Sequence, residues 1–189
     1  MVIINLQKSA QQLQMYAERN SLTIHPGKCK VLILSKKRFI GPFPKLDLCG
    51  KSLDIVSSTK CLGVDIDDEP KWDIHTTKIA KRFSTKVKKM YQMREMPKST
   101  LCSIYFQGIL PSILYGILIW GNCSPSSMAN IERIHIRAAR FIHRMKKSIP
   151  DSAVLDLVKW KSIMFYYKRV LHAKFIRSTM SFHLHYYQT

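Results

Sequence analysis

The start of the chain carries a helical pattern of apolar residues followed by a strand pattern. Four apolar residues recur at intervals of three and four positions, which predicts one face of an amphipathic helix. They are Leu6, Ala10, Leu13 and Ala17. The stretch TIHPGK then ends the helix, and CKVLIL, which is rich in β-branched residues, predicts a short strand.

A hairpin and a further strand are expected next. The stretch LDLCGKSLDIV alternates apolar and acidic residues on either side of Gly50-Lys51, which predicts a two-residue turn with glycine in first place. The stretch KCLGVDI predicts one more strand. The part of the chain before Pro70 is therefore expected to contain a helix, a strand, a β-hairpin and a strand.

Beyond Pro70 the periodicity is helical, and two predicted helices each carry an apolar face beside a basic one. The apolar faces are Ile79, Phe83, Val87 and Met90, and Ile131, Ile134, Ala138, Phe141 and Met145. The basic faces are Lys78, Arg82, Lys86 and Lys89, and Arg133, Arg137, Arg140 and Arg144.

Residues 99–130 contain no charged side chain, which predicts a buried helical hairpin arm. The apolar run Ile109–Trp120 is too short to span a bilayer and predicts a buried helix. The expected fold class is α+β, a small mixed region followed by an all-α bundle.

Charge indicates the kind of partner and the boundaries. The chain has 31 Lys and Arg against 12 Asp and Glu, and its net charge of +19 predicts a polyanionic partner, with nucleic acid as the leading candidate. Most of this excess lies in residues 71–148. We expect regions at 1–69, 70–148 and 149–189.

Four guanidinium groups on one helical face could follow a phosphate backbone. A solvated basic face is the alternative, and the presence of two such faces favours binding.

Cysteines and the amino terminus indicate the compartment. The five cysteines are scattered and lack metal-ligand spacing, which is typical of reduced thiols in an intracellular protein. The first residues lack the pattern of a secretory signal. We expect a nuclear or cytoplasmic protein that is not secreted and has no membrane partner.

Five stretches, taken in order, resemble the carboxy-terminal part of the reverse transcriptases of non-LTR retrotransposons. They are LQKSAQQLQMYAERNSLTIHPGKCKVLILSKK, LDLCGKSLDIVSSTKCLGVDID, KWDIHTTKIAKR, ILPSILYGILIWGN and IERIHIRAARFIHR. The resemblance implies that 1–69 is a palm remnant with motif D and a primer-grip-like hairpin. It implies that 70–148 is a basic, helical, thumb-like region and that 149–189 is a carboxy-terminal helical extension.

The same resemblance assigns individual positions. Lys28 matches the lysine of motif D, and Leu62-Gly63-Val64 matches the centre of the primer grip. Cys61 stands where the family usually has an aromatic residue. Trp72 and His75 match the opening of the first thumb helix, and Trp160 matches a tryptophan beyond it. For His75 and Trp160 we expect packing and capping roles.

The catalytic part of the family's site is not expected in this chain. The resemblance places the catalytic aspartates upstream of the first helix, and the chain contains no Tyr-x-Asp-Asp. Asp65, Asp67 and Asp68 are expected to be solvated loop carboxylates rather than metal ligands. We therefore expect no catalytic residue, no metal site and no cofactor, with Mg²⁺ required only in a complete family member.

The predicted function is that of a fragment of an RNA-directed DNA polymerase, inactive alone, that binds template–primer nucleic acid. Its expected partner is RNA or an RNA/DNA duplex, and the amino-terminal part of the polymerase is a second candidate partner. A free-standing basic RNA- or DNA-binding module without enzymatic activity is the alternative. A third possibility is a chain that folds poorly, because one strand and a hairpin leave unpaired edges.

Overall fold

The protein is seen in a computed structural model that describes residues 2–34, 45–69 and 71–186, with side chains from residue 6 to residue 176 within those ranges. The chain divides into two compact units, Met1–Pro70 and Lys71–Thr189. The three regions expected from the sequence, 1–69, 70–148 and 149–189, stay a prediction.

The amino-terminal unit begins with the helix that the apolar periodicity predicts. Helix α1 (Val2–Arg19) ends where Ser21 adopts a left-handed backbone with φ 54°, and the Leu22 N–H closes the helix by donating to the Ala17 carbonyl at 2.8 Å. A 3-10 turn, η1 (Pro26–Lys28), leads into strand β1 (Lys30–Leu32), which pairs in parallel with β4 (Asp54–Val56).

The expected hairpin is present, but its turn lies one residue earlier than predicted. Strands β2 (Asp47–Leu48) and β3 (Lys51–Ser52) are antiparallel, with Leu48 opposite Lys51. The turn is thus Cys49-Gly50, with φ values of 50° and 72°. Both residues are left-handed, which is the geometry of a type I′ turn with glycine second. The prediction of Gly50-Lys51 was wrong because the period-2 pattern does not fix the register by itself.

The stretch KCLGVDI is also a hairpin and not the single strand that was predicted. Strands β5 (Ser58–Cys61) and β6 (Val64–Asp67) are antiparallel and are joined by Leu62-Gly63, with φ values of 46° and 86°. A leucine at the first position of such a turn is unusual, because that position favours Asn, Asp or Gly. The sequence therefore did not look like a turn.

Helix α1 is fixed to the first hairpin chiefly by glutamine side chains. The Gln7 amide donates to the Asp47 carbonyl at 3.0 Å and accepts from the Asp47 N–H at 3.1 Å, and Gln14 Oε1 accepts from the Cys49 N–H at 3.2 Å. Leu48 and Ala17 are buried, whereas Leu13 is exposed. The three sheets described have two strands each.

The carboxy-terminal unit is helical throughout the part that the structure describes. Its longer helices are α2 (Asp73–Met90), α6 (Pro125–Ile142), α7 (Asp151–Val158) and α8 (Ile163–Tyr186). Between α2 and α6 lie the short helical segments η2 (Tyr91–Met93), α3 (Lys98–Ser103), the π-helix η3 (Ile104–Ile109), α4 (Leu110–Leu114) and α5 (Ile117–Trp120). The α+β class predicted from the sequence is confirmed.

The apolar run that was predicted to be one buried helix is interrupted. Helix α4 ends at Leu114, Gly116 takes φ 67°, and α5 restarts at Ile117. The Trp120 indole N–H donates to the Tyr115 carbonyl at 2.9 Å, which ties the two sides of the break together. Helical periodicity does not mark this break, because apolar residues continue through it and only Gly116 indicates it.

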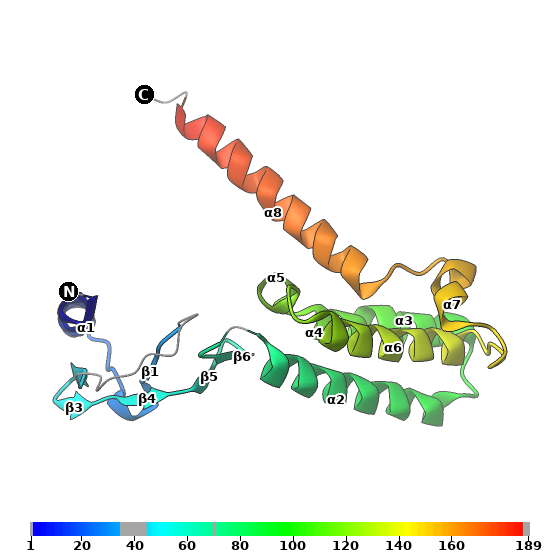
Figure 1. The fold of residues 1–189 in the computed structure, drawn as a ribbon, viewed down its shortest axis with the longest axis horizontal. Helices are drawn as coiled ribbons and strands as arrows, with labels where there is room; N and C mark the ends of the chain where they lie inside the picture. The colour runs from blue at the N-terminus through cyan, green and yellow to red at the C-terminus, as the bar shows by residue number, and fades with distance from the viewer. Residues whose placement is uncertain (1, 35–44, 70, 187–189) are drawn as a thin grey trace. The chain divides into compact units, whose positions relative to one another are not determined.

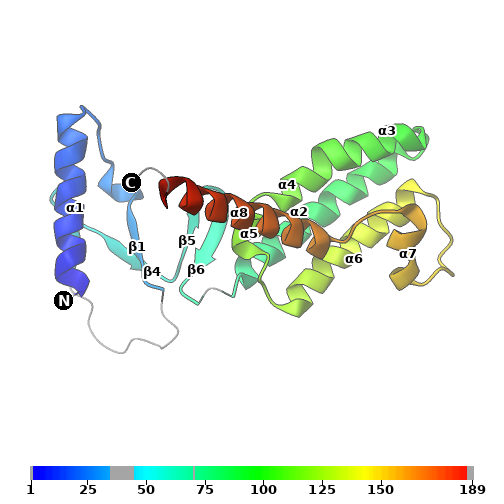
Figure 2. The same cartoon turned by 90° about the horizontal axis from the view of Figure 1, so that it is seen from above.

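Helices α2 and α6 run side by side in the same direction, and the segment from α3 to α4 runs back in the opposite direction alongside them (Figures 1 and 2). Asp73 and Ser127 make contact at their amino-terminal ends, and Tyr91 and Phe141 at their carboxy-terminal ends. Side chains such as Phe83, Tyr105 and Ile131 fill the core between them. Within the described residues, no helix combines the length and apolarity needed to cross a membrane.

Candidate nucleic-acid interface

The basic face predicted on the first helix of the bundle is present on α2. Burial of Ile79, Phe83, Val87 and Met90 turns the other side of the helix outward. Lys78, Arg82 and Lys89 are exposed. Lys86 is half-buried, and its ammonium donates to the Ser112 hydroxyl at 2.6 Å on α4. Three of the four predicted cations therefore face solvent on one helix.

The arginines predicted on the second helix fall into two environments. Helix α6 starts at Pro125 behind Ser124, whose hydroxyl accepts from the Ser127 N–H at 3.2 Å. Arg133 and Arg137 are exposed on this helix. The helix ends at Ile142, so Arg144 lies beyond it, with φ 51°. The expected stripe of four on one helical face was thus wrong at its end.

Arg140 is engaged within the protein. Its guanidinium donates to Asp151 Oδ1 at 2.7 Å and 3.1 Å, to the Lys146 carbonyl at 3.0 Å, and to the Ile149 carbonyl. The Arg140 side chain is only 17% exposed. These bonds use four of the five N–H groups of the guanidinium. Arg140 therefore ties the loop after α6 to the start of α7, and the prediction that it contacts phosphate stays untested.

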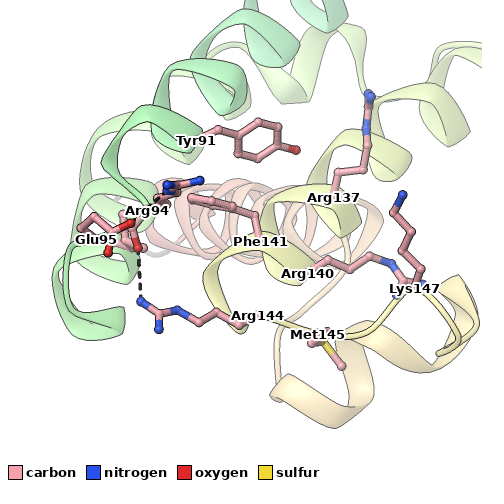
Figure 3. A pocket seen from close by; sticks show the side chains of 10 residues that line it. Tyr91, Arg94, Glu95, Arg137, Arg140, Phe141, Arg144, Met145 and Lys147 are labelled. Atoms are coloured by element: carbon pink, nitrogen blue, oxygen red, sulfur yellow. Dashed lines mark hydrogen bonds and ion pairs between the residues drawn. The ribbon is translucent and has the colours of Figure 1, made fainter.

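A pocket of about 710 Å³ opens at the carboxy-terminal ends of α2 and α6 (Figure 3). At its centre the rings of Tyr91 and Phe141 meet with centroids 4.6 Å apart. Figure 3 shows Arg94 and Arg144 on one side of the rings and Arg137 and Lys147 on the other. Arg137 and Arg144 stand out in the sequence, but the pocket does not, because Tyr91 and Phe141 come from separate helices.

The primer-grip-like residues occupy the tip and the base of the second hairpin. Leu62 is 85% exposed at the tip, Gly63 completes the turn, and Val64 is buried. Leu62 in a left-handed backbone carries a conformational cost. The hairpin thus exposes the Leu62 side chain to solvent and buries the Val64 side chain.

The aspartates beside this hairpin were expected in a solvated loop, which is wrong for two of them. Asp65 and Asp67 lie in β6, are half-buried, and share one face of the strand because side chains alternate. Asp68 is exposed after the strand, and its carboxylate accepts from the Glu69 N–H at 3.0 Å. Among the described residues, no group of three or more His, Cys, Asp or Glu side chains is arranged to hold a metal ion. The expectation that these carboxylates hold no metal stays a prediction.

Lys28 and the aromatic residues that the resemblance matched can be located in the structure. Lys28 is exposed at the end of η1. His75 is buried with its ring 6.2 Å from that of Trp120. Trp160 stacks on Tyr105 with centroids 4.9 Å apart and an interplanar angle of 14°. His75 and Trp160 thus contribute to packing.

A buried polar cluster in the bundle was missed by the sequence analysis. His135 lies between the Tyr105 hydroxyl and the Lys161 carbonyl, and its Nε2 is 3.0 Å from that carbonyl. Because a carbonyl only accepts, Nε2 carries the proton and Nδ1 accepts from Tyr105. Burial lowers the pKa of His135 to about 4 and raises that of Tyr105. The cluster is a neutral hydrogen-bonded pair in the core, which we regard as structural.

A half-buried carboxylate caps helix α8. Glu132 Oε2 accepts from the Ile163 N–H at 2.8 Å at the start of α8. Burial raises the pKa of Glu132, and the bond from Ile163 works against that rise. An anionic carboxylate at this place offsets the positive end of the helix. Glu132 thus serves the fold and not the basic surface.

Comparison with known proteins identifies a distant relative. The chain is 24% identical over 144 residues to the RNA-directed DNA polymerase from mobile element jockey of Drosophila melanogaster. The match covers 74% of this chain and 15% of the length of the relative. No protein-family model matches the chain, and no solved structure matches it. The resemblance to a non-LTR reverse transcriptase is confirmed as a distant relationship to such a polymerase.

Proposed function

We propose that this chain is a palm-and-thumb portion of an RNA-directed DNA polymerase from a non-LTR retrotransposon and that it binds the template–primer duplex. The observation that supports this most is the pair of exposed basic faces on α2 and α6, in a chain related to such a polymerase. The relative is an RNA-directed DNA polymerase, and the match covers 15% of its length. Polymerisation itself is assigned to the whole protein and not to this segment.

The proposed contacts are to phosphates. The predicted cations that are exposed are Lys78, Arg82 and Lys89 on α2 and Arg133 and Arg137 on α6. Cations on the surface of a rigid helix neutralise backbone phosphates without reading the bases. Binding through them depends steeply on salt and weakly on sequence.

The hairpin of β5 and β6 is proposed as the element that contacts the primer end. Leu62 is exposed at a turn position that favours Asn, so the sequence keeps a large apolar side chain there against the local preference. A strained residue at an exposed tip is a candidate for function. An apolar side chain can pack against the sugar or base of a terminal nucleotide.

The second candidate is a free-standing basic module that binds RNA or DNA for a structural purpose. The net charge of +19 favours it equally, since charge does not distinguish a polymerase thumb from another basic domain. The two candidates differ in the hairpin. In a polymerase segment Leu62 affects binding to a duplex with a recessed primer end, whereas in a simple basic module it does not.

The test is charge removal on the two faces with a matched control. Arg82→Gln, Arg133→Gln and Arg137→Gln are combined and compared with Lys168→Gln, Arg169→Gln and Lys174→Gln, three exposed cations of α8. Each phosphate contact removed should flatten the salt dependence of RNA/DNA duplex affinity by roughly one unit of slope. We expect a loss of roughly three units for the first triple and no change of slope for the second. Equal losses would show that net charge alone governs binding.

The run Lys36, Lys37 and Arg38 is another candidate control, because its charge density is similar and the sequence predicts a solvated loop there, before Gly41 and Pro42. These residues lie outside the part of the chain that the structure describes. The α8 triple replaces them because its three side chains are exposed and belong to the same unit as the basic faces. The comparison thus varies position while the charge removed stays the same.

A further inference from the structure

The pocket at the ends of α2 and α6 has the size of a ligand site. Its volume of about 710 Å³ lies within the range of roughly 300–1,000 Å³ typical of small-molecule pockets. A groove that only follows a duplex backbone does not need such a hollow. The pocket and all of its lining belong to the helical unit.

The floor of the pocket is aromatic. Tyr91 is 40% exposed, and it packs on the half-buried Phe141, their rings inclined at 54°. The contact with Phe141 fixes the Tyr91 ring while part of it stays open to solvent. A partly exposed, supported aromatic ring is a platform on which a nucleobase can stack.

Positive charge surrounds this platform. Arg137, Arg144 and Lys147 are exposed and make no ion pair that involves another described residue. Arg144 is held in place because its guanidinium donates to the Arg94 carbonyl at 3.2 Å. Figure 3 shows these cations on both sides of the rings, so that positive charge flanks the platform. Arg94 itself is paired with Glu95 at 2.9 Å.

From this arrangement we propose that the pocket holds one unpaired nucleotide of the bound nucleic acid, with its base on Tyr91 and its flanking phosphates on Arg137, Arg144 and Lys147. The proposal rests on the proposed function and deepens it, because it names the form of nucleic acid that this end of the bundle prefers. A paired base cannot stack on a protein ring while it lies within its own duplex. The pocket therefore selects a junction between duplex and single strand.

A purely structural role for the same cations predicts something different. Cations near the carboxy-terminal ends of two parallel helices offset the negative ends of the helix dipoles. That role accounts for Arg144 and explains neither the exposed Tyr91 ring nor the hollow in front of it. It also predicts no difference between paired and unpaired nucleic acid.

The experiment compares three labelled ligands by fluorescence anisotropy with the full chain. They are a blunt RNA/DNA duplex, the same duplex with a short single-stranded extension, and that extension with an abasic position next to the duplex. We expect the extended duplex to bind roughly tenfold more tightly than the blunt one, the size of one stacked base. The abasic ligand lacks the base that would stack on Tyr91. Its affinity should therefore exceed that of the blunt duplex only by the contribution of the additional phosphates.

Variants connect this preference to the pocket. Tyr91→Leu should remove the advantage of the base over the abasic position and leave the affinity for the blunt duplex unchanged. Tyr91→Phe should keep the advantage, since the ring is retained. Tyr115→Leu removes another exposed tyrosine of the same unit and should change nothing. Far-ultraviolet circular dichroism confirms that each variant is folded.

Two outcomes would overturn the proposal, and they are separable from failure of the proposed function. Equal affinity for the base and the abasic position, or a Tyr91→Leu loss that is the same for all three ligands, refutes the pocket assignment and leaves duplex binding intact. Absence of binding to any of the three ligands refutes the proposed function and the pocket with it.

Discussion

Arg140 should be the one arginine of the predicted stripe whose loss costs stability. Its guanidinium is tied to Asp151 and to the carbonyls of Lys146 and Ile149, and its side chain is 17% exposed. Arg137, one turn earlier on the same helix, is exposed and makes none of these bonds. Replacing Arg140 by alanine removes the guanidinium donor from two carbonyls and one carboxylate.

The magnitude follows from the number and kind of these bonds. The ion pair is partly screened because Asp151 is 62% exposed, so it contributes about 1 kcal/mol or less. Each bond from a charged donor to a carbonyl contributes about 1–2 kcal/mol, reduced where water can replace the donor. Arg140→Ala should therefore lower the free energy of unfolding by about 2–3 kcal/mol, and Asp151→Asn by about 1 kcal/mol or less.

Urea unfolding followed by tryptophan fluorescence measures this directly. All three tryptophans, Trp72, Trp120 and Trp160, lie in the helical unit, so the signal reports that unit alone. Arg137→Ala serves as the matched control and should change the midpoint little. An equal loss for Arg137→Ala and Arg140→Ala, or no loss for Arg140→Ala, would refute the assignment of Arg140 to the fold.

Three further predictions concern the core, the hairpin and catalysis. Burial lowers the pKa of His135 from 6.5 to about 4. As the pH falls, the histidine is therefore protonated in the unfolded state before it is protonated in the folded state. The free energy of unfolding should then fall by roughly 3 kcal/mol between pH 6.5 and pH 4. A His135→Gln variant should show a shallower fall in pH-dependent urea midpoints, and an unchanged slope would contradict the assignment. Leu62→Asn should stabilise the hairpin turn by roughly 0.5–1 kcal/mol, measured by hydrogen exchange. The same variant should bind a duplex with a recessed primer end more weakly, measured by fluorescence anisotropy. Unchanged affinity would refute the proposed contact with the primer end. Primer extension with Mg²⁺ or Mn²⁺ should show no product from this chain alone, and product that disappears in Asp67→Ala plus Asp68→Ala would refute the view that these carboxylates do not hold metal.

The features that local periodicity determines could be read from the sequence. The apolar faces of α2 and α6 follow from residues three and four positions apart, and in the structure Ile79, Phe83 and Ile131 are buried as predicted. Because burial of the apolar face fixes the orientation of α2, the side of the helix that carries the basic residues could also be predicted. The change from strands to helices near Pro70 was visible for the same reason.

Features that depend on contacts between distant residues could not be read in this way. Arg94 and Arg144, which meet at the pocket, are separated by 50 positions in the sequence. Tyr105 and His135, which form the buried hydrogen bond, are separated by 30 positions. Arg140 has the spacing of a surface residue, and only the fold shows that it bonds to the loop after its own helix. The turn at Leu62 was missed because its first residue goes against local preference.

The central claim, that exposed cations on α2 and α6 bind the phosphates of a duplex, is tested most directly by the salt dependence of affinity. Five predicted cations are exposed on these helices, Lys78, Arg82, Lys89, Arg133 and Arg137. The logarithm of the association constant for an RNA/DNA duplex should fall linearly with the logarithm of the salt concentration, with a slope of roughly −4 to −5. The slope should be the same for duplexes of unrelated sequence. A slope between zero and about −1, or no measurable binding at low salt, would contradict the account.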